Sequence, residues 1–91
     1  MGQKICVRVD VTGQVQGIGF RATTKRIAQK YGITGSATNQ KNGGVSVIAC
    51  GEEDSIAQLV QWLHKGPEGA QIDEVDVEEV SVEPPESFTT G

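Results

Sequence analysis

The stretch that decides the fold is KICVRVDVTGQVQGIGFR, which covers residues 4–21. Within residues 4–12 every second side chain is apolar, and this period predicts a half-buried strand. Glycines then recur at positions 13, 17 and 19, and their density predicts a loop. From Phe20 the apolar side chains recur at helical spacing. A strand, a glycine-rich loop and a helix therefore follow one another in this stretch.

The remaining sequence continues the alternation of strands and helices. We expect the first helix to run from Phe20 to Tyr31, because Gly32 is a natural stop. A second helix should begin at the acidic residues 52–54, where the helix dipole favours negative charge, and end before Gly66. Further strands are expected at residues 33–39, 45–50 and 72–82, with a hairpin turn at 41–44 and a bulge near Glu78 and Glu79. Residues 87–90 are either a short strand or a loose tail.

The order of these elements is β-α-β-β-α-β over a single domain, residues 1–91. It predicts the α+β class and a ferredoxin-like sandwich, in which one antiparallel sheet carries two helices on one face. In this topology the first and second strands run parallel with the third between them, so their carboxyl ends lie at the same edge. We therefore expect the glycine-rich loop to lie near Asn39, which ends the second strand.

The same topology brings the two cysteines together. Cys6 starts the first strand, and Cys50 ends the antiparallel strand beside it. Both lie on the face expected to be open, so a cross-strand disulfide is geometrically feasible. Because the cytoplasm keeps thiols reduced, we expect two thiols in the cell and oxidation in the purified protein.

Composition and charge exclude several classes of function. The net charge is −4, which argues against nucleic acid as a partner because duplex binding needs a dense basic face. Seven of the eight basic residues fall within residues 1–50, so an anion site is expected in that half. No apolar run approaches the length of a membrane span, and no signal peptide follows Met1. We expect a cytoplasmic monomer that does not associate with membranes.

The glycine-rich loop has the chemistry of an anion site. Backbone N–H groups of such a loop can point inward, and the N-terminus of the following helix adds unpaired donors and positive potential. The Arg21 guanidinium can bind two phosphate oxygens at once. An ordinary turn with a surface arginine is the alternative, and the loop alone does not decide between them. The candidate phosphate-binding residues are Val15, Gln16, Gly17, Ile18, Gly19, Phe20 and Arg21.

Two segments resemble the acylphosphatase family. VTGQVQGIGFR, residues 11–21, is similar to the signature loop of that family, and Thr24 matches a threonine often found three residues after its arginine. GSATNQKNGGV, residues 35–45, is similar to a second segment with a glycine, an asparagine and a turn into a strand. The chain departs from the family at Ser36 and Thr38, where an aromatic and a basic residue are usual. The resemblance covers nearly the whole chain.

The resemblance implies hydrolysis of acyl phosphates to a carboxylate and inorganic phosphate. It implies that Arg21 and the loop amides hold the phosphoryl group and that Asn39 positions a water. The leaving carboxylate is a weak base, so the scheme needs no strong general acid, no metal and no cofactor. The alternative is a non-catalytic module that binds phosphate or carbamoyl phosphate, because similar domains occur within larger hydrogenase-maturation proteins.

Overall fold

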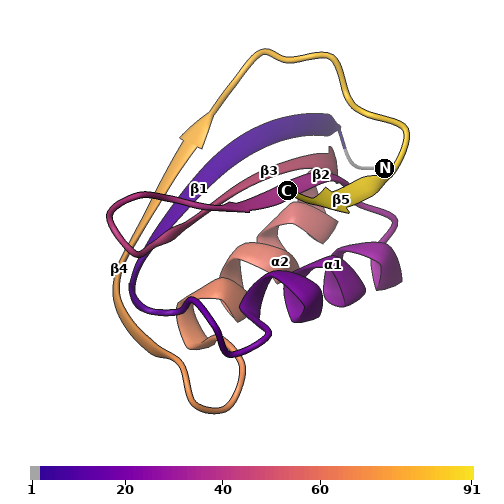
Figure 1. Cartoon of the computed structure of the whole chain (residues 1–91). Helices are drawn as coiled ribbons and strands as arrows, with labels where there is room; N and C mark the ends of the chain where they lie inside the picture. The colour runs from indigo at the N-terminus through magenta and orange to yellow at the C-terminus, as the bar shows by residue number, and fades with distance from the viewer. Residues whose placement is uncertain (1–2) are drawn as a thin grey trace.

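The structure is a computed structural model that describes residues 3–91 (Figure 1). Five strands and two helices follow one another along this part of the chain. In sequence order they are β1 (Lys4–Gln14), α1 (Phe20–Lys30), β2 (Thr34–Asn39), β3 (Val45–Glu52), α2 (Glu53–Lys65), β4 (Gln71–Glu79) and β5 (Phe88–Thr90). The predicted elements are all present, and residues 87–90, left open by the sequence, end in the short strand β5.

The strands form one sheet in the order β4-β1-β3-β2-β5, with both helices on one face (Figure 1). The first four strands pair antiparallel, as predicted for the ferredoxin-like sandwich, and β3 lies between β1 and β2. The fifth strand changes the prediction, because β5 pairs parallel to β2 and makes the sheet mixed. Strands β1 and β2 run in the same direction, so their carboxyl ends lie at the same end of the sheet.

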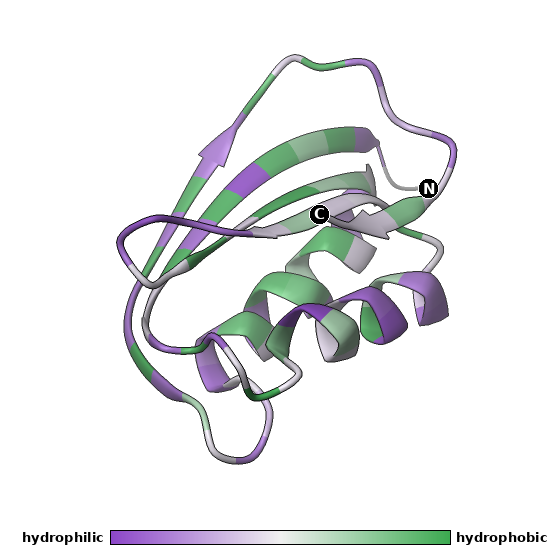
Figure 2. Ribbon diagram, in the orientation of Figure 1, coloured by the Kyte–Doolittle hydropathy of each residue, from purple (hydrophilic) through white to green (hydrophobic). Residues whose placement is uncertain are grey.

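The hydrophobic core lies between the sheet and the two helices. Strands β1 and β3 present alternate valines to it, and α2 presents Leu59 and Leu63, which are fully buried. Figure 2 shows hydrophobic residues along β1, β3 and α2, whereas hydrophilic residues predominate along β4. Burial of this alternating apolar face holds the sheet against the helices and fixes its register. Among residues 3–91, neither helix has the length and apolar character needed to cross a lipid bilayer.

The predicted bulge near Glu78 and Glu79 is wrong. The β1–β4 register runs without interruption from Val7, opposite Glu79, to Thr12, and shifts between Thr12 and Gly13. Gly13 has φ +129°, and a Cβ on it would clash with the backbone oxygen of Gln71. Thr12 lies opposite Glu74 and Gly13 opposite Ile72, so Asp73 is the extra residue and the bulge belongs to β4. Only glycine can occupy position 13 beside this bulge. Val75 and Val77 stand at odd positions, whereas Val80 and Val82 stand at even ones, because residues 80–82 lie beyond the end of β4.

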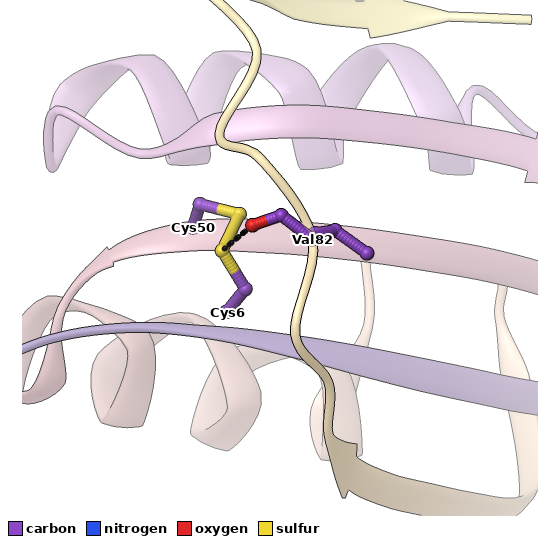
Figure 3. The surroundings of a disulfide bond; sticks show 3 residues. All are labelled: Cys6, Cys50 and Val82. Carbon is purple, nitrogen blue, oxygen red and sulfur yellow. Dashed lines mark hydrogen bonds between the residues drawn. A yellow bond between two sulfur atoms is a disulfide. The ribbon is translucent and has the colours of Figure 1, made fainter.

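Residues 80–87, here called the crossover segment, connect the two edges of the sheet over the face opposite the helices (Figure 1). The segment covers a disulfide between Cys6 and Cys50, which lie directly opposite each other in β1 and β3. The Sγ of Cys6 lies 3.7 Å from the backbone oxygen of Val82 (Figure 3). The predicted proximity of the cysteines is confirmed, and both are buried on the sheet face away from the core. Their reduction in the cell remains a prediction.

Candidate functional site

The loop between β1 and α1 turns on two glycines. Gly17 has φ +80° and Gly19 has φ +77°, and apart from the adjacent residues no described part of the chain lies within 4 Å of a Cβ built on either. Both positions therefore need glycine for its backbone conformation and not for space. The residues between and after them, Ile18 and Phe20, have ordinary negative φ angles. A loop with alternating signs of φ can turn successive N–H groups toward one side and form a concavity suited to an anion.

The N-terminus of α1 adds further donors to this concavity. Gly19 is the N-cap, and no side chain among residues 3–91 forms a capping hydrogen bond with the helix. The first turn carries no acidic residue. The first helical bond to the loop runs from the Thr23 N–H to the Gly19 oxygen, at 2.9 Å. The N–H groups of the preceding helical residues have no acceptor within the helix. An anion in front of them satisfies these donors and interacts favourably with the helix dipole.

Three contacts hold the loop in place. Val15 and Phe20, at its two ends, are buried in the core, and the Phe20 ring lies 5.8 Å from the Trp62 ring of α2. In the middle of the loop, the Nε2 of Gln16 donates hydrogen bonds of 2.8 Å to the backbone oxygens of Gln40 and Gly44. The loop is thereby fixed to the helix layer and to the β2–β3 hairpin.

Thr24 reinforces the first turn of α1. Its side chain is fully buried, and its hydroxyl donates a 2.7 Å hydrogen bond to the backbone oxygen of Phe20. The hydroxyl is thus satisfied within the helix and does not reach the concavity. Thr24 therefore supports the position of Phe20 and has no direct contact with a ligand.

A cavity of about 160 Å³ lies against the loop and contains both residues predicted to act in catalysis. Arg21 reaches it from the first turn of α1, and Asn39 reaches it from the end of β2. Because a liquid water occupies about 30 Å³, this volume accommodates a tetrahedral anion and a water. The lining residues are Val15, Gln16, Gly17, Gly19, Phe20, Arg21, Ala22, Asn39 and Thr90.

The structure thus brings together every predicted site residue except one. Ile18 does not line the cavity, and its side chain is 37% exposed at the tip of the loop. Sequence reasoning missed Ala22 and Thr90. Ala22 follows Arg21 in a helix and carries no chemical signal. Thr90 could have been found only by knowing that residues 88–90 form a strand beside β2.

The charge of the cavity comes from Arg21 and from backbone donors. None of the described residues that line the cavity has a carboxylate or an imidazole side chain. The Nη1 of Arg21 donates to the backbone oxygen of Gly91 at 2.6 Å, and this contact holds the guanidinium at the cavity. Asn39 contributes an uncharged amide side chain to the same cavity. The arrangement suits a phosphoryl dianion with an adjacent water oriented by an amide.

A larger hollow, about 850 Å³, lies at the other end of β1. It is formed by the crossover segment, the disulfide and the ends of β1 and β3. Its charged residues are Lys4, Glu52 and Glu79, so two carboxylates outnumber one ammonium, and Glu52 occupies the N-cap of α2 there. The smaller cavity is therefore the candidate anion site, because its described lining contains Arg21 and no carboxylate side chain, whereas the larger hollow contains two carboxylates.

Comparisons with known proteins agree with this geometry. The family model "Acylphosphatase" matches residues 7–90. An acylphosphatase of Chromohalobacter salexigens is 41% identical over 86 residues, which are 94% of this chain and 96% of that protein. The structure of an acylphosphatase from Coxiella burnetii superposes with a TM-score of 0.92 at 39% identity, covering 97% of this chain and 93% of the other.

A third match comes from a much longer protein. The crystal structure of full-length HypF in its phosphate- and nucleotide-bound form superposes with a TM-score of 0.92 at 32% identity. The match covers 100% of this chain and 12% of the HypF chain.

Proposed function

This chain belongs to the acylphosphatase family and hydrolyses acyl phosphates to a carboxylate and inorganic phosphate, and on that premise we propose which residues perform the reaction. The amides of residues 15–21 and the Arg21 guanidinium hold the phosphoryl oxygens. Asn39 positions the attacking water. The observation that carries this assignment is the cavity in which the loop, Arg21 and Asn39 converge.

The phosphoryl group is bound by donors that are already in place. The positive φ of Gly17 and Gly19 and the hydrogen bonds of Gln16 hold the loop without a ligand. Such preorganised donors stabilise the charge that develops on the phosphoryl oxygens without further rearrangement. Arg21 adds a full positive charge and a planar pair of N–H donors.

The chemical step requires little from the protein besides positioning. The water oxygen forms a bond to phosphorus while the bond from phosphorus to the carboxyl oxygen breaks. The electron pair of that bond leaves with the carboxylate, and a proton of the water passes to a phosphoryl oxygen. The Asn39 amide does not ionise near neutral pH, so it orients the water and does not act as its base.

The leaving carboxylate is stable without protonation, so we further propose that hydrolysis is independent of metals and cofactors. The transition-state charge is then stabilised by Arg21 and the loop amides alone. The cytoplasmic location, the monomeric state and the extent of the single domain remain predictions from the sequence.

The alternative, a non-catalytic binding module, has less support. The chain matches 96% of the Chromohalobacter acylphosphatase and 93% of the Coxiella one, whereas it matches 12% of HypF. Tight phosphate binding without turnover would nevertheless favour the module.

The experiment is hydrolysis of an aromatic acyl phosphate in the presence of a metal chelator, with the wild type and Asn39→Ala side by side. We expect chelator-resistant turnover by the wild type. Asn39→Ala should lower kcat strongly and leave the inhibition constant of inorganic phosphate nearly unchanged. Ser36→Ala, on the same strand but on the opposite face, is the matched control and should behave as wild type. Loss of phosphate binding in Asn39→Ala would show that its assigned role is wrong.

A further inference from the structure

Thr90 lies in the cavity beside Asn39. It is the last residue of β5 and pairs with Ala37 in the parallel ladder between β2 and β5. The N–H of the next residue, Gly91, donates to the Ala37 oxygen at 3.0 Å and fixes this register. Since side chains alternate along a strand, Asn39 shares the face of Ala37 two residues further on. Thr90 and Asn39 are therefore diagonal neighbours that face the same cavity.

The face on which Thr90 lies is fixed by Phe88. Phe88 is 2% exposed and packs in the core between sheet and helices. Thr90 lies two residues further along the same strand, so its side chain must point to the same side of the sheet, toward the first turn of α1. Thr89 points to the opposite face. The orientation of Thr90 toward the cavity is thus a consequence of the buried phenylalanine.

The Thr90 hydroxyl is available for a ligand. Within residues 3–91 it forms no hydrogen bond with another residue, and Thr90 is exposed to solvent at the cavity. A hydroxyl offers two acceptor lone pairs and one donor. Arg21 is the charged donor in the described lining of the cavity. Asn39 and Thr90 line the same cavity, and each carries a side-chain oxygen that can accept a hydrogen bond.

We propose that Thr90 is a third catalytic residue, whose Oγ1 accepts a hydrogen bond from the attacking water that Asn39 also binds. This inference rests on the proposed role of Asn39. A water has two O–H bonds; when one points to Asn39 Oδ1 and the other to Thr90 Oγ1, the free lone pair is directed at phosphorus. Fixing both O–H bonds leaves the water with one reactive orientation.

The bonds formed and broken are the same as in the reaction in which Asn39 alone binds the water. The water oxygen bonds to phosphorus, and the carboxylate departs with the electron pair of the broken bond. The water proton passes to a phosphoryl oxygen and does not remain on Thr90, because a threonine hydroxyl is too weak a base to hold it. Thr90 thus contributes orientation, and its removal should lower kcat without weakening phosphate binding.

The test compares Thr90→Val, Thr90→Ser and Thr89→Val. Thr90→Val keeps the branched shape and removes the acceptor, so kcat should fall about 3- to 10-fold, as expected for one hydrogen bond. The inhibition constant of inorganic phosphate and the thermal midpoint should stay close to wild type. Thr90→Ser should restore kcat to within about twofold, since it keeps the hydroxyl. Thr89→Val, the control on the opposite face, should be unaffected.

A double-mutant comparison separates this inference from the proposed function. If both residues bind the same water, Asn39→Ala combined with Thr90→Val should be scarcely slower than Asn39→Ala alone. Full multiplication of the two effects would overturn the inference. So would wild-type kcat in Thr90→Val, a matching loss of phosphate affinity, or failure of Thr90→Ser to restore turnover. Wild-type kcat in Asn39→Ala would instead disprove the underlying assignment of the water site.

Discussion

The Nη1 of Arg21 donates a 2.6 Å hydrogen bond to the backbone oxygen of Gly91, 70 residues further along the chain. The bond joins the first turn of α1 to the residue that follows β5. A guanidinium has five N–H donors, so one bond to Gly91 leaves the others free for phosphoryl oxygens. The last strand therefore helps to set the position of the cation on which phosphate binding depends.

Arg21→Ala should weaken phosphate affinity and turnover together. Loss of one donor to a developing anion typically costs about 2–4 kcal/mol of transition-state stabilisation, and we expect a reduction of kcat/KM in that range. Steady-state kinetics and phosphate inhibition measure both effects. Arg26→Ala removes an exposed arginine from the same helix and should leave both constants unchanged. Equal effects of the two substitutions would mean that general charge, and not the Arg21 contact, is responsible.

Gln16→Ala should loosen the phosphate loop. It removes both hydrogen bonds to the β2–β3 hairpin, each worth about 0.5–1.5 kcal/mol. Because the freed backbone oxygens can be hydrated, we expect the inhibition constant of phosphate to rise more than the free energy of unfolding falls. Gln29→Ala, at an exposed position of α1, is the control. Unchanged phosphate affinity in Gln16→Ala would show that the loop keeps its shape without the hairpin.

Gly19→Ala should cost stability and phosphate affinity through the backbone alone. Gly19 has φ +77° with open space around its Cα, so alanine adds no clash but disfavours the left-handed conformation by about 1–2 kcal/mol. Gly32→Ala is a matched control, because Gly32 has φ +70°, equally open space, and lies beyond the C-terminal end of α1. Both variants should lose similar stability in urea unfolding. Only Gly19→Ala should lose phosphate affinity.

Reduction of the disulfide should lower stability and spare activity. Cys6 and Cys50 close a loop with a sequence separation of 44 residues, for which a disulfide typically contributes about 2–4 kcal/mol. We expect the urea midpoint to fall when a reductant is added, with kcat within about twofold, because the disulfide lies at the end of β1 away from the phosphate loop. The Cys6→Ala, Cys50→Ala double variant should not respond to the reductant. A large change in kcat on reduction would indicate that the crossover segment transmits the effect to β5.

Local patterns were sufficient to predict most of the fold. The alternation in residues 4–12 predicted β1, and the helical spacing after Phe20 predicted α1. Each element buries one face, and the burial of one face sets the period of its apolar residues. The bulge was misplaced because Val80 and Val82 were read as strand residues, whereas they lie in the crossover segment. Its true position is Asp73, opposite Thr12 and Gly13, where Gly13 approaches Gln71 in a long-range contact with no local signal.

The part of the site that is contiguous in sequence was predictable, whereas the part that depends on long-range strand pairing was not. The loop and Arg21 are contiguous in sequence, and the strand order brought Asn39 to them. The contributions of Thr90 and Gly91 depend on β5 pairing parallel to β2, and three residues with one apolar side chain do not specify that pairing. The hydrogen bonds of Gln16 likewise depend on where the hairpin packs, which the sequence pattern does not encode.

The most direct test of the central claim is an NMR titration of the backbone amides with inorganic phosphate, recorded for the wild type and for Arg21→Ala and Asn39→Ala. The account predicts saturable shifts of the amide signals of residues 15–21 in the wild type and in Asn39→Ala, at similar phosphate concentrations, and greatly weakened binding in Arg21→Ala. Saturable shifts confined to other residues, with the loop amides unmoved, would contradict it.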